Sequence, residues 1–191
     1  MTLDSARLHP NVDNAMMVLV DVQGRLARLM HHSEAMIRQQ RLLIQALQIL
    51  KVPIIWAEQV PDKLGGTVDE LTEVLEMVEP RHKVSFGCCE DKPLSEAIEE
   101  SQRTHILLAG IETHVCVWQT ASTLLERGHH VHVIEDAISS RQAENKAIGL
   151  KRMYQAGAVA SCVEMALFEL MGRADHPDFR TISGLIKEAT A

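Results

Sequence analysis

The chain passes from a buried strand into a helix along Ile106-Leu107-Leu108-Ala109-Gly110-Ile111-Glu112-Thr113-His114-Val115-Cys116-Val117. The apolar run over residues 106–109 is typical of a strand buried in a parallel sheet. A helix is predicted over residues 113–127, with Cys116 in its first turn and Gly128 just past its end. A helix N-terminus carries unpaired N–H groups and partial positive charge, which lower the pKa of a thiol from about 8.5 to roughly 3.5–7.5. This unit predicts an α/β protein with a reactive thiol at the end of a strand.

Predicted strands and helices alternate along the rest of the chain. Strands are predicted over residues 16–20, 52–57, 83–84, 104–109, 131–134 and 158–160. Further helices are predicted over residues 33–50, with Ser33 as the N-cap, and over residues 68–77, 93–102, 143–155, 163–171 and 179–189. Residues 59–68 contain Pro61, Gly65 and Gly66 and are predicted to form a loop. This alternation predicts a three-layer α-β-α, Rossmann-like fold with a mostly parallel sheet of about six strands.

Composition limits the classes of protein to which the chain can belong. Its 191 residues show no repeat or linker, so a single domain over residues 1–191 is predicted. Aromatic residues are only 3% of the chain, so the core must be aliphatic. The net charge of -7 and the lack of a basic patch argue against nucleic acid or an anionic membrane as a partner.

The cysteines and the N-terminal residues indicate the compartment. Four cysteines in a chain of 191 residues are not the pattern of a disulfide framework. The start, Met1-Thr2-Leu3-Asp4-Ser5, lacks the charged and apolar regions of a signal peptide. No apolar run reaches the roughly 18 residues of a membrane span. We therefore expect a cytoplasmic protein.

Three reactive side chains fall at or near the ends of predicted strands: Asp21, Lys83 and Cys116. Ligands of open parallel sheets bind beyond the carboxyl ends of the strands. There Asp21 could accept the thiol proton, and Lys83 could stabilise the charged carboxylate and thiolate. Attack on a carbonyl would create an oxyanion, which the N–H groups of Glu112 and Cys116 could stabilise.

These residues carry a resemblance to the isochorismatase-like cysteine hydrolase superfamily over roughly residues 15–160. The matching motifs are Asp21-Val22-Gln23, Lys83 and the Gly110-to-Val117 segment quoted above. The chain is more narrowly similar to the isochorismatase domain-containing proteins. That closer match rests on Glu58-Gln59-Val60-Pro61, Leu64-Gly65, Lys83-Val84-Ser85-Phe86, Asp136-Ala137-Ile138-Ser139-Ser140-Arg141 and His176-Pro177-Asp178-Phe179.

The resemblance implies an isochorismatase hydrolase fold with an Asp21–Lys83–Cys116 catalytic triad. It also implies a non-proline cis peptide at Ile111–Glu112, which turns backbone N–H groups toward the oxyanion. True isochorismatases have no cysteine at this position, so Cys116 indicates the branch that hydrolyses amides through a thioester. A homo-oligomer, as a dimer or a larger assembly, is likewise expected.

Nicotinamidases of the superfamily bind a metal through an Asp-x-His pair and another histidine. The corresponding segment here, Trp56-Ala57-Glu58-Gln59-Val60-Pro61, has no histidine. We therefore expect no metal and no cofactor, and we disfavour nicotinamide as the substrate.

Several neighbouring residues have a functional and a structural interpretation. Gln23, Phe86 and His114 are candidate pocket residues, although His114 could instead meet a neighbouring subunit. The Glu112 carboxylate is expected to point away from the thiolate, because a like charge would raise the thiol pKa. Asp136 and Arg141 are expected in one loop after a strand, where an ion pair is favoured over substrate contact.

The remaining cysteines and histidines are expected to be structural. Cys88 and Cys89 are interpreted as ordinary cysteines near the edge of the pocket, and Cys162 as a core residue. His129, His130 and His132 alternate with valine, which favours a solvated strand start with the histidines outward over a metal site.

The favoured function is a cysteine hydrolase that cleaves a small amide or related carbonyl compound. One alternative is a catalytically silent, oligomeric interaction module that retains the family pocket. A weaker alternative is a thiol redox sensor, in which Cys88 or Cys89 would have to lie within disulfide reach of Cys116.

Overall fold

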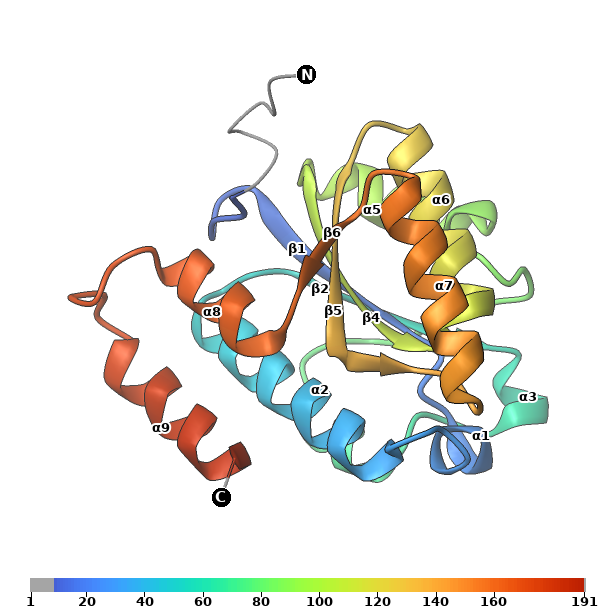
Figure 1. The fold of residues 1–191 in the computed structure, drawn as a ribbon, viewed down its shortest axis with the longest axis horizontal. Helices are drawn as coiled ribbons and strands as arrows, with labels where there is room; N and C mark the ends of the chain where they lie inside the picture. The colour runs from blue at the N-terminus through green and yellow to red at the C-terminus, as the bar shows by residue number, and fades with distance from the viewer. Residues whose placement is uncertain (1–8, 191) are drawn as a thin grey trace.

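The computed structural model describes residues 9–190, and a six-stranded parallel sheet forms its centre (Figure 1). The strands are β1 (Ala15–Val20), β2 (Ile54–Gln59), β3 (Arg81–Lys83), β4 (His105–Ile111), β5 (His130–Ser139) and β6 (Val159–Ser161). They lie in the order β3-β2-β1-β4-β5-β6, and every neighbouring pair is parallel. The predicted fold class is confirmed.

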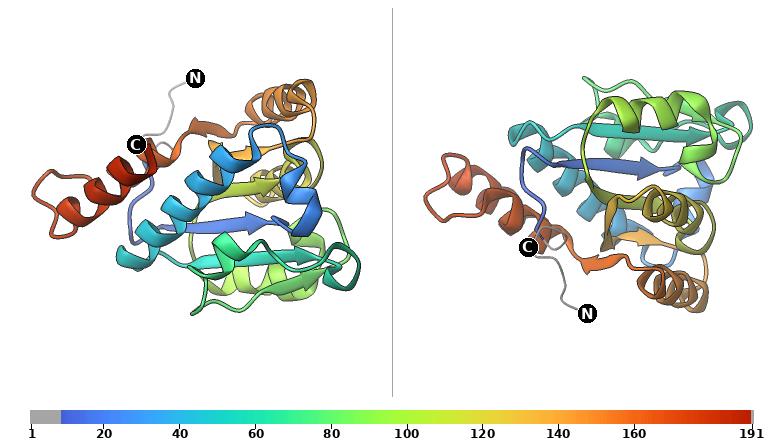
Figure 2. Two further views of the ribbon diagram at one scale, coloured as in Figure 1. Left: turned by 90° about the horizontal axis from the view of Figure 1, so that it is seen from below. Right: turned by 90° about the horizontal axis from the view of Figure 1, so that it is seen from above.

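Helices cover both faces of the sheet (Figure 2). The α-helices are α1 (Gly24–Arg28), α2 (Ser33–Ile49), α3 (Pro61–Leu64), α4 (Asp69–Thr72), α5 (Lys92–Glu100), α6 (Trp118–Glu126), α7 (Ala143–Gln155), α8 (Val163–Met171) and α9 (Phe179–Thr190). A 3-10 turn spans Cys88–Glu90, and a π-helical turn spans Thr113–Val117. Helices α2, α8 and α9 lie on one face, while α5, α6 and α7 lie on the other.

The side chains of β1 show why two cores form. Met17 and Leu19 enter the core beneath α2, whereas Met16 and Val18 enter the core beneath α5 and α6. Alternate residues of a strand point to opposite faces, so a strand covered on both faces is apolar at every position. All six residues of β1 are fully buried.

Some predicted boundaries were wrong. Ser33 is not an N-cap: it is the first residue of α2, and its hydroxyl donates to the Ala27 carbonyl at 2.8 Å. The loop over residues 59–68 contains the short helix α3, which begins at Pro61 because proline fits the first helical turn. The helix predicted over residues 68–77 is regular only in α4, and β3 ends at Lys83. The helix predicted over residues 113–127 is a π-helical turn followed by α6.

The strand order defines the place where a ligand can bind. Chain connections lead from β1 to β2 and β3 on one side, and then to β4, β5 and β6 on the other. The order therefore reverses between β1 and β4, and crevices form beyond the carboxyl ends of the strands at such a switch point. Residues directly after β1 and β4 border that crevice.

Two further predictions concern a signal peptide and a membrane span. The segment Met1-Thr2-Leu3-Asp4-Ser5 lies outside the described residues. Within residues 9–190, no helix is long and apolar enough to cross a membrane.

Candidate active site

The structure brings Asp21, Lys83 and Cys116 together at the switch point. Asp21 follows β1 directly, Lys83 ends β3, and Cys116 lies in the π-helical turn after β4. Lys83 Nζ donates to Asp21 Oδ2 at 2.6 Å, and the Lys83 side chain is completely buried. Asp21 has a φ of 53°, a left-handed conformation that is uncommon for residues other than glycine, although aspartate adopts it more readily than most.

Gly110 places the turn that carries Cys116 beside Asp21. In the register of β1 and β4, Gly110 lies opposite Val20, the residue before Asp21. Gly110 has a φ of 120°, and a Cβ atom there would lie 2.1 Å from the Val20 carbonyl oxygen. Only glycine permits this approach, which fixes the start of the turn next to the carboxylate.

The Lys83 ammonium is saturated with acceptors. Besides Asp21, its Nζ contacts Gln59 Oε1 at 2.7 Å and the carbonyl oxygens of Ser85 at 3.1 Å and Phe86 at 2.9 Å. An ammonium has only three N–H groups, so these four acceptors leave none for a substrate. Lys83 therefore positions Asp21 and the Phe86 loop from behind the site.

The Cys116 thiol is not activated in the way that the sequence predicts. The pKa of the Cys116 thiol is raised to about 12, chiefly by burial. The nearby Asp21 carboxylate also raises this pKa, and its effect is larger than the lowering effect of Lys83. The expectation of a lowered pKa was wrong, because Cys116 is only 8% exposed and sits in a π-helical turn beside a carboxylate. At neutral pH the resting thiol therefore carries its proton.

The Asp21 carboxylate can receive that proton. Burial raises the pKa of Asp21 above its usual range, despite the opposing effects of Lys83 and of the nearby Cys116 thiol. While Oδ2 accepts from Lys83, Oδ1 is buried and has no standard hydrogen-bond partner among the described residues. An unpaired carboxylate oxygen beside a neutral thiol is the arrangement of a general base.

Backbone N–H groups lie at the start of the π-helical turn. The peptide bond between Ile111 and Glu112 is cis, at the position that the family resemblance implies. The Glu112 carbonyl accepts the N–H groups of Val115 at 3.0 Å and Val117 at 3.3 Å. The Glu112 N–H forms no backbone hydrogen bond within residues 9–190. An N–H group without a backbone partner can donate to an oxyanion placed near it.

Glu112 is neutralised by Arg141. Its carboxylate accepts the Arg141 backbone N–H at 2.9 Å and the Arg141 Nε–H at 3.2 Å. The expected ion pair between Asp136 and Arg141 was wrong. Asp136 lies within β5, which is longer than predicted, and its Oδ1 accepts the Val163 N–H at the start of α8. The sequence could not reveal that Arg141 contacts a residue 29 positions earlier.

A small cavity opens at these residues, with a volume of about 120 Å³. It is lined by Asp21, Leu26, Gln59, Leu64, Phe86, Ile111, Glu112, Val115 and Cys116. Four lining residues were not among the predicted site residues: Leu26, Gln59, Leu64 and Val115. Three of them have apolar side chains, which carry no chemical signal of function.

Of the three candidate pocket residues, only Phe86 lines this cavity. The Gln23 side chain is fully buried, and its amide donates to the Gly65 carbonyl at 2.7 Å and accepts the Gln59 N–H at 2.7 Å. His114 Nδ1 is hydrogen-bonded to Ser140 Oγ at 3.0 Å. Both residues hold loops around the cavity.

Cys88 and Cys89 are buried, as ordinary core cysteines are. Burial raises the pKa of the Cys88 thiol far above its usual range and that of Cys89 to about 11. Thr120 links this region to the site, because its hydroxyl accepts the Cys88 N–H at 3.0 Å and donates to the Cys116 carbonyl at 2.8 Å. Cys162 is half-buried.

The histidines of β5 do not all face solvent. His132 is buried, and its Nε2 lies 2.9 Å from Nδ1 of the equally buried His105. The predicted outward orientation was wrong for His132, because helices cover both faces of β5. His129 and His130 are half-buried. Across residues 9–190, no group of three or more His, Cys, Asp or Glu side chains is arranged to hold a metal.

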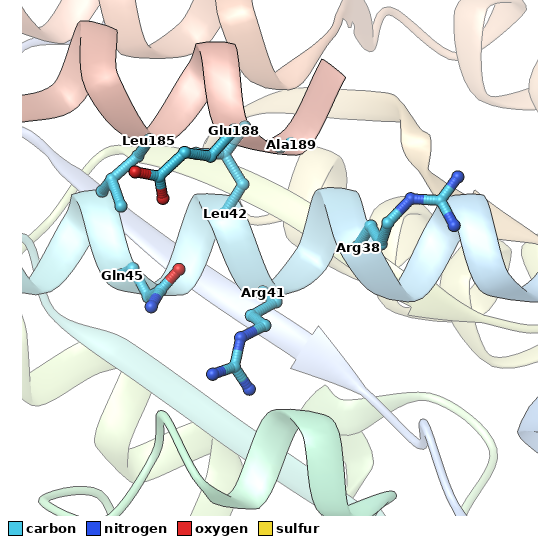
Figure 3. A pocket seen from close by; sticks show the side chains of 7 residues that line it. All are labelled: Arg38, Arg41, Leu42, Gln45, Leu185, Glu188 and Ala189. Atoms are coloured by element: carbon cyan, nitrogen blue, oxygen red, sulfur yellow. The ribbon is translucent and has the colours of Figure 1, made fainter. Parts of the chain in front are cut away.

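A second hollow lies between α2 and α9 (Figure 3). Its volume is about 310 Å³, and its lining is Arg38, Arg41, Leu42, Gln45, Leu185, Glu188 and Ala189. None of these residues is a nucleophile or belongs to the predicted site. We therefore place the candidate active site at the smaller cavity.

Known proteins resemble the chain over nearly its whole length. The isochorismatase domain family matches residues 15–165. The secreted isochorismatase effector Isc1 of Phytophthora sojae is 37% identical over 188 residues, covering 95% of this chain and 88% of that protein. Isochorismatase domain-containing protein 2 of Bos taurus is 35% identical over 175 residues, covering 92% of this chain and 84% of that protein.

A solved structure described as the MAR1 ribonuclease from Caenorhabditis elegans is also similar. It shares 37% sequence identity and superposes with a TM-score of 0.89, covering 94% of this chain and 92% of that one. Together with the family match, these similarities show that the chain belongs to the isochorismatase family.

Proposed function

We propose that this protein is a cysteine hydrolase that cleaves a small amide or related carbonyl compound through a thioester. Membership of the isochorismatase family supports a hydrolase. The observation that carries the finer proposal is the unpaired Asp21 Oδ1 beside the Cys116 thiol, with Lys83 bound to the other carboxylate oxygen.

The first half of the reaction forms the thioester. Asp21 Oδ1 takes the thiol proton while Cys116 Sγ attacks the substrate carbonyl carbon. The oxyanion that forms is stabilised by the N–H groups of Glu112 and Cys116. Collapse of this intermediate breaks the C–N bond, and Asp21 returns the proton to the leaving amine.

The second half regenerates the enzyme. Asp21 takes a proton from a water molecule, which attacks the thioester carbonyl. The acid product leaves, and the proton returns to Cys116. Throughout the cycle Lys83 keeps its contact with Asp21 Oδ2, so that Oδ1 handles the proton.

The similar structure from Caenorhabditis elegans is described as a ribonuclease, so we compare RNA with a small carbonyl compound as the substrate. Phosphate recognition depends on Lys and Arg side chains at the binding surface. Within residues 9–190, the cavity lining has two carboxylates and no Lys or Arg, and the chain carries a net charge of -7. We therefore favour a small carbonyl substrate over RNA.

Acylation by an activated ester tests the proposal. We expect p-nitrophenyl butyrate to give a burst of p-nitrophenol and a butyryl adduct, mapped by peptide mass spectrometry to Cys116. The Cys116→Ala variant should lose both signals. The matched Cys162→Ala variant, which removes a half-buried cysteine outside the cavity lining, should keep them.

Two outcomes would contradict the proposal. One is an adduct on Cys88 or Cys89 while Cys116 stays unmodified. The other is no acylation by esters and no ammonia release from small primary amides. The second outcome, combined with stoichiometric co-purification of a partner protein, would favour the interaction module.

A further inference from the structure

The walls of the active-site cavity offer almost no polar groups to a substrate. Leu26, Leu64, Phe86, Ile111 and Val115 provide its apolar surface. The one amide side chain in the lining, Gln59, is engaged at both ends: Oε1 accepts from Lys83 at 2.7 Å, and Nε2 donates to the Val84 carbonyl at 2.7 Å. The part of a substrate that does not react therefore meets hydrocarbon.

The charges at the cavity are balanced in pairs. Among the described residues that line the cavity, only Asp21 and Glu112 are charged. Their cationic partners, Lys83 and Arg141, do not belong to the lining. Lys83 has no N–H group left over for a substrate. A substrate carboxylate would therefore enter an apolar space, approach two carboxylates and find no free cation in the lining, which is a costly position.

The cavity is also small. Its volume of about 120 Å³ lies below the roughly 300–1,000 Å³ of sites that hold drug-sized ligands. Phe86 and Leu64 are 56% and 36% exposed, so both walls also face solvent. Those two side chains limit how far an acyl chain can extend.

We infer that the acyl part of the substrate is a short, uncharged aliphatic chain, and that Phe86 and Leu64 determine its length. This inference rests on the proposed hydrolase function. Paired lining charges and an apolar wall disfavour charged or polar acyl groups, and the small volume disfavours long or branched ones. The structure thus assigns a substrate class to the Cys116 site.

Alkylation of Cys116 tests the charge preference without any turnover. Iodoacetamide and iodoacetate differ little in size but differ in charge. Each forms an S–C bond and releases iodide, while the thiol proton passes to Asp21. The rate at Cys116 is measured by peptide mass spectrometry and divided by the rate with free N-acetylcysteine. We expect this normalised rate to be at least about tenfold lower for iodoacetate, because its charge must leave water. Equal normalised rates would overturn the inference.

Two variants identify the source of the preference. Glu112→Gln leaves the Arg141 charge unbalanced and should raise the normalised iodoacetate rate several-fold. Arg141→Gln, at a half-exposed side chain, leaves the Glu112 charge unbalanced and should lower that rate. If Glu112→Gln does not fold, Arg141→Gln still decides: a normalised iodoacetate rate that stays equal or rises contradicts the charge balance.

Turnover of three primary amides of similar length separates this inference from the proposed function. They are butyramide, the anionic succinamate and the cationic 4-aminobutyramide. Butyramide should have the highest kcat/KM, and Phe86→Ala should shift the optimum toward a longer chain. Preference for either charged amide would overturn the inference and leave the hydrolase proposal intact. Failure of every amide and ester to acylate Cys116 would instead overturn the proposed function.

Discussion

At the scale of single residues, the ion pair between Asp21 and Lys83 controls both stability and chemistry. The two side chains are 3% and 0% exposed, so each charge depends on the other for compensation. Lys83→Met leaves a carboxylate buried without its cation. We expect the free energy of unfolding to fall by about 3–5 kcal/mol, as measured by urea denaturation.

The double variant Asp21→Asn/Lys83→Met is the matched control. It removes both charges, so it should recover part of the lost stability while remaining inactive. Equal stability of the single variant and the wild type would show that the pair is not buried in solution.

Asp21 should also set the acid limb of the activity. Burial raises the pKa of this carboxyl above 3.8, and its protonated form cannot act as a base. Therefore kcat/KM should rise with pH, with a midpoint above 3.8 in the free enzyme. Asp21→Asn should remove this limb and lower kcat by roughly 10²–10⁴-fold. A wild-type limb that persists in the variant would assign the titration to another group.

The positions of the three candidate catalytic residues could be predicted, but the ionisation of the thiol could not. Asp21 and Cys116 follow apolar runs, which locates them at strand ends. Lys83 follows the polar stretch Pro80-Arg81-His82, so only the family resemblance identifies it. The pKa of Cys116 depends on its burial and on the distance to Asp21. Both are tertiary properties that no local pattern contains.

At the scale of elements, α7 holds the π-helical turn through a glycine. A Cβ atom at Gly149 would lie 2.9 Å from the Thr113 carbonyl oxygen and 3.0 Å from the His114 nitrogen. Gly149→Ala must therefore displace the turn that carries Cys116. We expect kcat/KM to fall by up to about 100-fold, because small misplacements of reacting groups are that costly.

A second helical glycine provides the control for Gly149→Ala. Gly184 lies in α9, and among the described residues no atom outside its own stretch of helix lies within 4 Å of a Cβ atom placed there. Gly184→Ala should leave kcat/KM unchanged and stabilise the protein by up to about 1 kcal/mol, through helix propensity alone. If both variants lose activity to the same extent, the contact between α7 and the turn has no special role.

Elements with strong periodicity were predicted well, and elements set by tertiary contacts were not. Helices α7 and α8 match their predicted limits. By contrast, β5 runs for ten residues, because its second half, which includes Glu135 and Asp136, pairs with the end of β4. The charged residues in that half do not fit the sequence pattern of a buried strand. Their pairing with β4 is what makes this segment a strand.

At the scale of the whole molecule, the buried histidine pair couples folding to pH. Burial lowers the pKa of His132 from 6.5 to about 4. Between these two pH values the unfolded chain binds a proton that the folded protein excludes. Stability is therefore retained above pH 6.5 and decreases as the pH falls toward 4, by about 3 kcal/mol in total.

Urea denaturation at several pH values measures this dependence. His132→Gln retains a hydrogen-bonding group opposite His105 but cannot titrate in this range. Its stability should depend less steeply on pH between 6.5 and 4. Parallel curves for the variant and the wild type would assign the pH dependence to other groups.

The overall architecture could be predicted because strands and helices alternate, whereas the strand order could not. Each apolar run identifies a strand, yet nothing local shows that β4 lies beside β1 across the switch point. The single domain over residues 1–191, the homo-oligomer and the cytoplasmic location stay predictions. Light scattering of the purified protein measures its oligomeric state directly.

The four contacts of the Lys83 ammonium have a consequence for how this protein can diversify. The same nitrogen binds the carboxylate of Asp21 and the carbonyl of Phe86. A backbone shift that widens the mouth near Phe86 therefore also perturbs the proton acceptor. A change in substrate selectivity is therefore most easily reached by substituting Phe86 or Leu64. An insertion in the Phe86 loop would widen the range of substrates but lower the reaction rate. Laboratory evolution of the enzyme should accordingly accumulate substitutions at those two walls and leave the length of the Phe86 loop unchanged.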